Sequence, residues 1–370
     1  MTKYSYSFLL IAATLLLAAC SKTMSPDLPL PQIRNEAVIV STENSTLLSY
    51  QASTGNKLWE VTTDGPVDIS PVINLENVWC ISRKGTVTVV NVKTGKKTLE
   101  VATGLLNNKG ICLGDNMLFL ASDQLYALSP ANGTPLWMAT NGSPCTGAPQ
   151  YHNGKVYVAT GNNVMCVDAA TGVVVWMSAG VPSPMESGVK VSNGLVYAGA
   201  TDGRIYAFKE VDGSPVWNYQ TGDKVQSSPA VYGGMCVAGS YDYSIYCVDT
   251  TSGALRWKYP TKERVHSSAT FHEFTNSVLI GSYDFNLYCI DHVSGTLRWK
   301  YPTASLIKSS PVVYKDYVYF SSYDRYLYCV DVKDGRTVWK QFMNANTQSS
   351  PIVDDTENAL YNSESGMGKY

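Results

Sequence analysis

The sequence is poor in charge and has no run of basic residues. Charged residues make up 16% of its 370 residues, and the formal net charge is −2 at pH 7. Proteins that bind nucleic acid generally present clustered Lys and Arg side chains. The sequence therefore predicts no nucleic-acid partner.

Motifs typical of catalytic or metal sites are also missing. The nine cysteines include no vicinal pair, no C-x-x-C and no C-x-x-C-H, so the spacings of redox, zinc and c-type haem sites are absent. There are only four histidines, and neither G-x-S-x-G nor H-E-x-x-H occurs. We expect no catalytic residue, no metal, no cofactor and no enzymatic activity.

Helical patterns are absent beyond the N-terminal segment. No window of ten or more residues after it places apolar residues at helical spacing without Gly or Pro. The sequence therefore predicts an all-β protein.

The first residues are typical of a lipoprotein signal peptide. Lys3 precedes an apolar stretch from Phe8 to Leu17, which ends in small residues before Cys20. The stretch is too short for a permanent membrane span, so we expect residues 1–19 to be removed and Cys20 to be lipidated. The alternative is an ordinary signal peptide with Cys20 as a bystander. Residues 20–35 are Pro-rich and predict an extended tether, followed by one body over 36–370.

A repeat of about 40 residues fills that body. A turn glycine recurs at Gly55, Gly95, Gly133, Gly172, Gly213, Gly253, Gly295 and Gly335. Four residues after each glycine comes Trp59, Leu99, Trp137, Trp176, Trp217, Trp257, Trp299 or Trp339. The sequence therefore contains eight repeats, and one of them has leucine in place of tryptophan.

Each repeat predicts four short antiparallel strands. In the repeat 226–259 the runs 229–231, 235–239, 244–248 and 255–259 are β-branched or aromatic and are separated by turn residues. Units of four strands arranged in a ring form a β-propeller, so we predict eight blades. The seven repeated tryptophans are expected to be structural and to pack between blades.

Four cysteines occupy one position of the repeat. Cys166, Cys247, Cys289 and Cys329 stand where other repeats have Ala127 and Ala207. A position that alternates between Ala and Cys indicates a small buried slot rather than a disulfide framework.

The recurring pattern x-S-S-P…V-Y…S-x-D…L-Y-C-V-D…S/T-G…W resembles the repeats of the pyrroloquinoline-quinone-like (PQQ-like) propeller family over nearly all of residues 36–370. Within that family, the lipoprotein signal and the short connections resemble the propeller lipoproteins of outer-membrane β-barrel assembly. The resemblance implies a non-enzymatic, lipid-anchored envelope scaffold, in the outer membrane, with a body in the periplasm or at the cell surface.

The termini supply one strand pair too many. Residues 37–41, 46–50 and 57–61 compete with 351–353, 359–362 and 366–370, so either the C-terminal end or residues 37–50 lies outside the ring. A blade shared between the termini is the expected closure.

One repeat position predicts a ring of polar side chains at the mouth of the central channel. Three residues before the proline position of the SSP motif stand Asp68, Asn108, Thr146, Glu186, Gln226, His266, Lys308 and Gln348. This ring is a candidate site for an ion or small ligand, and a solvated channel rim is the alternative.

Three neighbouring repeats carry aromatic residues in the hairpin between their second and third strands. The hairpins are Tyr241-Asp242-Tyr243, Tyr283-Asp284-Phe285 and Tyr323-Asp324-Arg325. Aspartate suits a turn, whereas an exposed aromatic cluster is typical of a protein-binding or sugar-binding surface. We predict one aromatic patch at these tips.

Three functions remain open. The first is a scaffold that binds another envelope protein, and the second is a lipoprotein that binds carbohydrate or another small ligand. The third, a quinoprotein dehydrogenase, is implied by the same repeat family and requires a calcium site. Glu186, Asn108 and Asp68 are its conceivable ligands, but the repeat spreads them around a ring.

Overall fold

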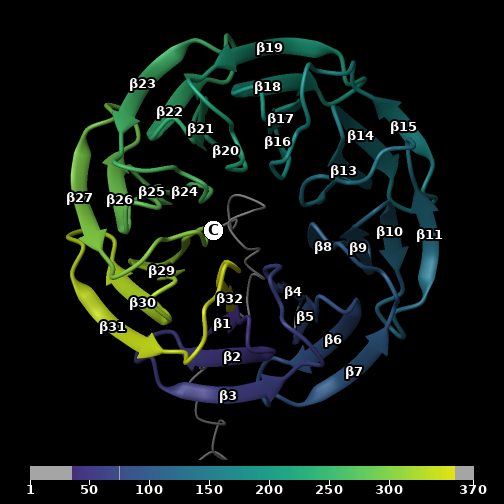
Figure 1. The fold of residues 1–370 in the computed structure, drawn as a ribbon, viewed down its shortest axis with the longest axis vertical. Coiled ribbons are helices and arrows are strands. Elements are labelled where there is room, and N and C mark those ends of the chain that lie inside the picture. The colour runs from purple at the N-terminus through teal and green to yellow at the C-terminus, as the bar shows by residue number, and fades with distance from the viewer. Residues whose placement is uncertain (1–35, 75, 355–370) are drawn as a thin grey trace, which may run out of the picture. The chain divides into compact units, whose positions relative to one another are not determined.

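The computed structural model describes residues 36–74 and 76–354, and these form eight four-stranded antiparallel sheets arranged as the blades of a ring (Figure 1). The predicted all-β, eight-bladed propeller is confirmed. Cys20, the signal peptide, the tether and the segments 359–362 and 366–370 lie outside the described residues. Within the described ranges, no helix is long and apolar enough to cross a membrane.

The blades are numbered 1 to 8 along the chain. The innermost strands of blades 1 to 8 are β32 (Ile352–Asp354), β4 (Val72–Asn74), β8 (Gly110–Gly114), β12 (Gln150–His152), β16 (Lys190–Ser192), β20 (Ala230–Tyr232), β24 (Thr270–His272) and β28 (Val312–Tyr314). The second strands are β1 (Ala37–Ser41), β5 (Asn77–Ile81), β9 (Met117–Ala121), β13 (Lys155–Thr160), β17 (Leu195–Gly199), β21 (Met235–Ser240), β25 (Ser277–Gly281) and β29 (Tyr317–Ser321).

The third strands are β2 (Thr46–Gln51), β6 (Thr86–Asn91), β10 (Leu125–Leu128), β14 (Asn163–Asp168), β18 (Arg204–Lys209), β22 (Ser244–Asp249), β26 (Asn286–Asp291) and β30 (Tyr326–Asp331). The outer strands are β3 (Lys57–Thr62), β7 (Lys97–Ala102), β11 (Pro135–Ala139), β15 (Val174–Met177), β19 (Pro215–Gln220), β23 (Leu255–Pro260), β27 (Leu297–Pro302) and β31 (Thr337–Phe342). In the repeat 226–259, the four strands match the predicted runs to within one residue at each end.

The ring is closed by a blade that both termini share. β32, from the C-terminal side, pairs antiparallel with β1, and Val353 lies opposite Val38. The expected shared blade is therefore present. The alternative that residues 37–50 lie outside the ring is wrong, because β1 and β2 are two of the four strands of this blade.

The repeated tryptophans connect neighbouring blades. The indole Nε1 of Trp339 in blade 8 donates a hydrogen bond to the carbonyl of Ala52 in blade 1 at 2.8 Å, and the ring packs on Gly55. Equivalent bonds to the following blade are made by Trp59, Trp137, Trp176, Trp217, Trp257 and Trp299. Each tryptophan therefore packs on the turn glycine of the next blade rather than on the glycine of its own repeat.

The small slot lies directly opposite the tryptophan. Cys329 pairs with Trp339 in the antiparallel register, and Ala127 pairs with Trp137. In blade 2 the tryptophan is replaced by Leu99, and its partner is the larger Val89. Volume is thus conserved across the pair, which is what a close-packed core requires. All eight described cysteines are buried and free.

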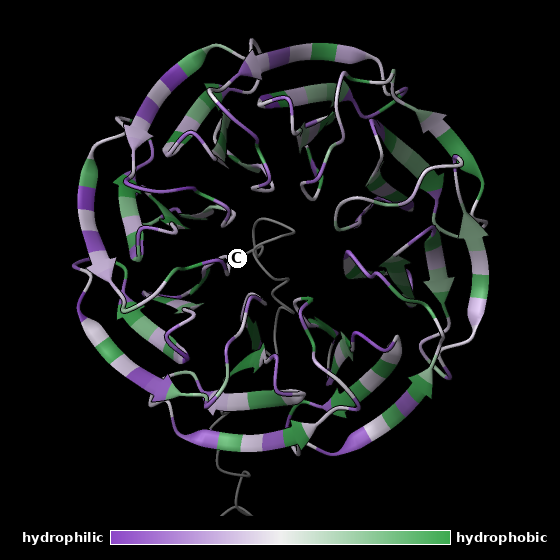
Figure 2. Ribbon diagram, viewed as in Figure 1, coloured by the Kyte–Doolittle hydropathy of each residue, from purple (hydrophilic) through white to green (hydrophobic). Residues whose placement is uncertain are grey.

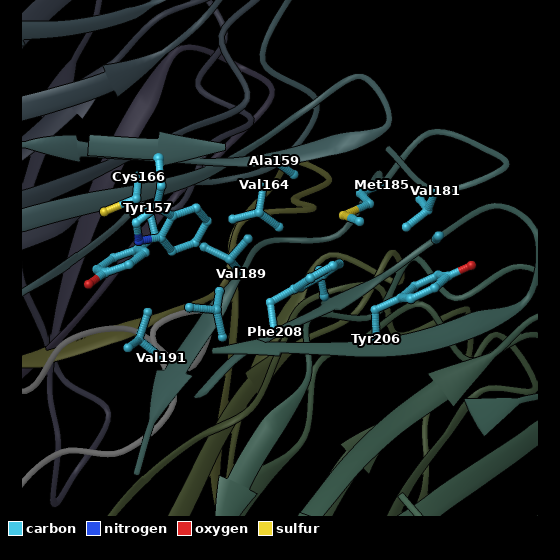
Figure 3. Packing of buried hydrophobic residues seen from close by; sticks show 14 residues of the cluster. Tyr157, Ala159, Val164, Cys166, Val181, Met185, Val189, Val191, Tyr206 and Phe208 are labelled. Atoms are coloured by element: carbon cyan, nitrogen blue, oxygen red, sulfur yellow. The ribbon is translucent and has the colours of Figure 1, made fainter. Parts of the chain in front are cut away.

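Apolar clusters fill the spaces between blades. One cluster joins Tyr157, Cys166 and Trp176 of blade 4 to Val189, Val191, Tyr206 and Phe208 of blade 5 (Figure 3). Because each blade buries its faces against its two neighbours, the hydrophobic core runs around the ring and leaves the axis to polar residues.

Candidate functional site

The eight channel-mouth residues meet in one cavity. Asp68, Asn108, Thr146, Glu186, Gln226, His266, Lys308 and Gln348 all line a cavity of about 540 Å³. They come from the loops that lead into the innermost strands, and the innermost strands lie in contact around the ring. One residue per blade therefore surrounds the same space.

Most of these side chains bond to their neighbours or to adjacent loops. Gln226 donates to the Glu186 carboxylate, and Lys308 donates to Gln348, whose Nε2 donates to Glu43 at 3.1 Å. Asp68 pairs with Arg83 in the same blade. The ring thus contains both hydrogen-bond donors and acceptors, and both acidic and basic side chains.

Aromatic rings cluster around His266 at the mouth. The His266 ring lies 6.1 Å from Tyr283, nearly parallel to it, and 6.2 Å from Tyr241. The Arg264 guanidinium lies over the Tyr241 ring, 5.2 Å from its centroid. Burial, with a smaller effect of the Lys308 charge, lowers the pKa of His266 to about 4. His266 is therefore neutral at neutral pH.

The three hairpin aspartates hold the loops in place. Asp284 Oδ2 accepts the Lys262 amide at 2.9 Å and the Tyr288 hydroxyl at 2.5 Å. Asp324 makes the same pair of bonds with Ala304 and Tyr328. Asp242 accepts the Gly222 amide and the Tyr246 hydroxyl. These carboxylates cross-link each hairpin to the loop that follows the preceding blade's outer strand.

The predicted single aromatic patch is divided in two. Tyr241 and Tyr283 are half-buried: Tyr283 stacks on His266, and Tyr241 lies tilted against it. The half-buried Tyr323 hydroxyl donates to Glu43 at 3.4 Å. The third residue of each hairpin instead has a positive φ, of 65° at Tyr243, 71° at Phe285 and 72° at Arg325. Tyr243 and Phe285 remain 43% and 47% exposed, and Arg325 is exposed as well. We call Tyr243, Phe285 and Arg325 the hairpin tips.

The channel residues do not fit a calcium-quinone centre. Calcium needs six or more converging oxygens. The two carboxylates that line the cavity, Asp68 and Glu186, lie in blades 2 and 5 and are bonded to Arg83 and Gln226. Among residues 36–74 and 76–354, no group of three or more His, Cys, Asp or Glu side chains could hold a metal ion.

A belt of serines around the channel was missed in the sequence analysis. The second serine of the SSP motif accepts the amide of its counterpart in the preceding blade at 2.8–3.0 Å, through Ser228, Ser268, Ser310, Ser350 and Ser70. Blades 3, 4 and 5 have Gly110, Ala148 and Gly188 at this position, and a β-carbon on Gly110 would lie 2.4 Å from that of Ala148. The recurrence of SSP is apparent in the sequence, but the hydrogen bonds of its second serine to the neighbouring blade are not.

Comparison with known proteins identifies the family. The model of a PQQ-like repeat family described as outer membrane protein assembly factor BamB matches residues 24–105, 107–185 and 245–367. The chain belongs to this BamB-type family. A curated BamB of Burkholderia pseudomallei is 27% identical over 233 residues, which cover 61% of this chain and 56% of that relative. The match thus spans little more than half the length of the relative.

Solved structures share the fold. The crystal structure of BamB from Moraxella catarrhalis has a TM-score of 0.65 at 18% identity, covering 80% of this chain and 92% of the other. The designed protein Ika8 has a TM-score of 0.72 at 16% identity, covering 81% and 94%. A europium-containing methanol dehydrogenase has a TM-score of 0.67 at 15% identity, covering 82% of each. BamB-type membership rests on the family model, since these structures share only the fold with this chain.

Proposed function

We propose that this protein is a non-enzymatic scaffold of the cell envelope, anchored through Cys20, that binds a protein of outer-membrane assembly. Membership of the BamB-type family supports this proposal. The contact surface that we assign is the set of hairpin tips.

The tips have the properties of a preorganised binding surface. They stand on the neighbouring blades 6, 7 and 8 and combine two exposed aromatic rings with an arginine, residue types that are enriched in protein interfaces. The aspartate cross-links beneath them fix the hairpins, which reduces the entropy lost on binding.

A crosslinked pull-down of the lipidated protein from its native membrane tests the proposal. We expect the wild type to recover an outer-membrane assembly protein and the variant Tyr243→Ser/Phe285→Ser/Arg325→Ser to lose it. Phe274→Ser is the matched control, because Phe274 is an exposed aromatic in the turn between β24 and β25, at the other end of its blade. Recovery of no specific protein with the wild type would contradict the scaffold proposal, and equal recovery with the tip variant would contradict the assigned surface.

The polar cavity favours a second candidate, the binding of a carbohydrate or another small ligand. Its donors and acceptors and the aromatic rings of Tyr241, His266 and Tyr283 are suited to a hydroxylated molecule. This function predicts that a soluble glycan changes tyrosine fluorescence, and that Tyr283→Ala removes the change. A screen without any response would eliminate it.

A further inference from the structure

The outer strands of the ring differ sharply in charge at one position. The residue after the repeated tryptophan, or after Leu99, is Glu60, Glu100, Met138, Met177, Asn218, Lys258, Lys300 or Lys340 in blades 1 to 8. Edge strands generally carry charged side chains because these discourage pairing with another chain. Blades 3 and 4 have methionine instead.

The apolar character extends over both outer strands. Leu136 and Met138 of β11, together with Val173, Val174, Val175 and Met177 in and beside β15, are between 37% and 63% exposed. These six residues are called the apolar rim. It is continuous across the two blades, because the turn at Gly172 packs directly on the Trp137 ring of β11. In Figure 2, β11 and β15 lack the strongly purple segments of β23 and β27.

The same part of the chain is depleted in charge. Residues 111–189 contain only the basic residue Lys155 and the acidic residues Asp115, Asp123, Asp168 and Glu186. β15 is also the last strand of its sheet, so it pairs with β14 on one side only and its other edge is unpaired. An uncharged, apolar strand with a free edge is suited to pair with another strand.

The distribution of charge allows that strand to be a second copy of β15. If β15 pairs antiparallel with a second β15 around Val175, then Val173 faces Met177 and Val175 faces its own copy. In this pairing no charged side chain lies opposite another. In β23 and β27, self-pairing would instead bring Arg256 and Lys258, or Arg298 and Lys300, opposite like charges, which destabilises a strand pair.

We infer that the apolar rim binds a second copy of this chain, with β15 pairing antiparallel to β15 of the other copy around a two-fold axis. The dimer is isologous, so each copy contributes the same surface. Leu136 and Met138 flank the strand pair and extend its apolar contact. The rim lies across the ring from the hairpin tips of blades 7 and 8 (Figure 1). These tips therefore stay accessible in both copies of the dimer.

The size of the rim predicts a weak dimer. Six half-exposed aliphatic side chains bury on the order of 500 Å² per copy, or about 1,000 Å² in total, which is near the lower limit of specific interfaces. The proposed anchor at Cys20, on which this step rests, would confine both copies to one membrane, raise their effective concentration and favour pairing.

Disulfide crosslinking of the full chain in its native membrane tests this inference. We expect Val175→Cys to give a crosslinked species of twice the monomer mass after mild oxidation. Val216→Cys is the matched control, because Val216 precedes the repeated tryptophan in β19 and is similarly exposed. It should give no dimer above the wild-type level.

A second pair of variants separates the rim from general surface effects. Met138→Lys/Met177→Lys introduces the lysine that three other blades carry at this position, so the fold should tolerate it. Combined with Val175→Cys, it should lower the dimer yield about tenfold or more. Leu58→Lys/Val338→Lys adds the same charge to β3 and β31, the outer strands of the adjacent blades 1 and 8, away from the rim. It should leave the dimer yield unchanged.

Three results would overturn the inference. Val175→Cys could give no dimer, the two cysteine variants could give equal yields, or Val175→Cys could crosslink to a protein of different mass. The last result would show that the rim binds a foreign partner. The hairpin-tip variant should have no effect on any of these yields.

Discussion

Replacing Gly55 by alanine tests the contact that closes the ring. A β-carbon at Gly55 would lie 2.7 Å from the Trp339 ring, and the residue has a φ of +73°. The positive φ costs a non-glycine residue about 1–2 kcal/mol, and overpacking costs about 1–3 kcal/mol more. We therefore expect Gly55→Ala to lower the free energy of unfolding by about 2–5 kcal/mol.

Gly104 is the matched control. It has the same φ of +73°, but a β-carbon there would meet nothing within 4 Å. Gly104→Ala should therefore lower the free energy of unfolding by only about 1–2 kcal/mol. Urea titrations followed by far-UV circular dichroism measure both losses. Equal losses would refute the reasoning, because they would show that Gly55 is needed for its backbone conformation and not for the approach of Trp339.

Three further predictions concern the belt, the channel and the slots. Ser268→Ala leaves the buried Ser228 amide without its acceptor and should lower stability by about 1–3 kcal/mol in the same titration. Because the folded-state pKa of His266 is about 4, below its ordinary value near 6.5, stability should fall as the pH drops below about 6.5 and be roughly 2 kcal/mol lower at pH 5. His266→Gln, which copies two other blades, should flatten that dependence, and an unchanged pH profile would exclude His266 as its origin. Burial raises the pKa of the Cys329 thiol to about 12, so a thiol reagent should modify neither it nor the other seven described cysteines in the native protein.

The architecture was accessible from the sequence because its signals are local and repeated. The spacing of turn glycines and tryptophans gives the blade number, and the Ala/Cys alternation gives a buried slot. The strand register of the structure adds contacts that the sequence of a single repeat does not specify. It places Cys329 opposite Trp339, and it seats that tryptophan on Gly55 of the next blade.

The candidate site could be predicted only in part, because only its channel ring depends on a local, repeated pattern. The channel ring depends on one position per repeat, and the structure brings all eight residues to one cavity. The aromatic patch depends on side-chain direction within a three-residue turn. The positive φ at Phe285 turns its ring outward while Tyr283 stacks on His266, and sequence spacing does not contain that difference.

The shared blade also affects the order of events during biogenesis. β1, β2 and β3 are made first, but their sheet lacks its innermost strand until residues 352–354 arrive. The complete sheet of blade 1 therefore cannot form before these residues are present, however early the intervening blades fold. A chain truncated before Ile352 would leave an open arc with an unpaired β1 edge, which is a target for proteases and for aggregation. Completion of blade 1 is thus coupled to the synthesis of residues 352–354, which begin 290 residues after the end of its outer strand.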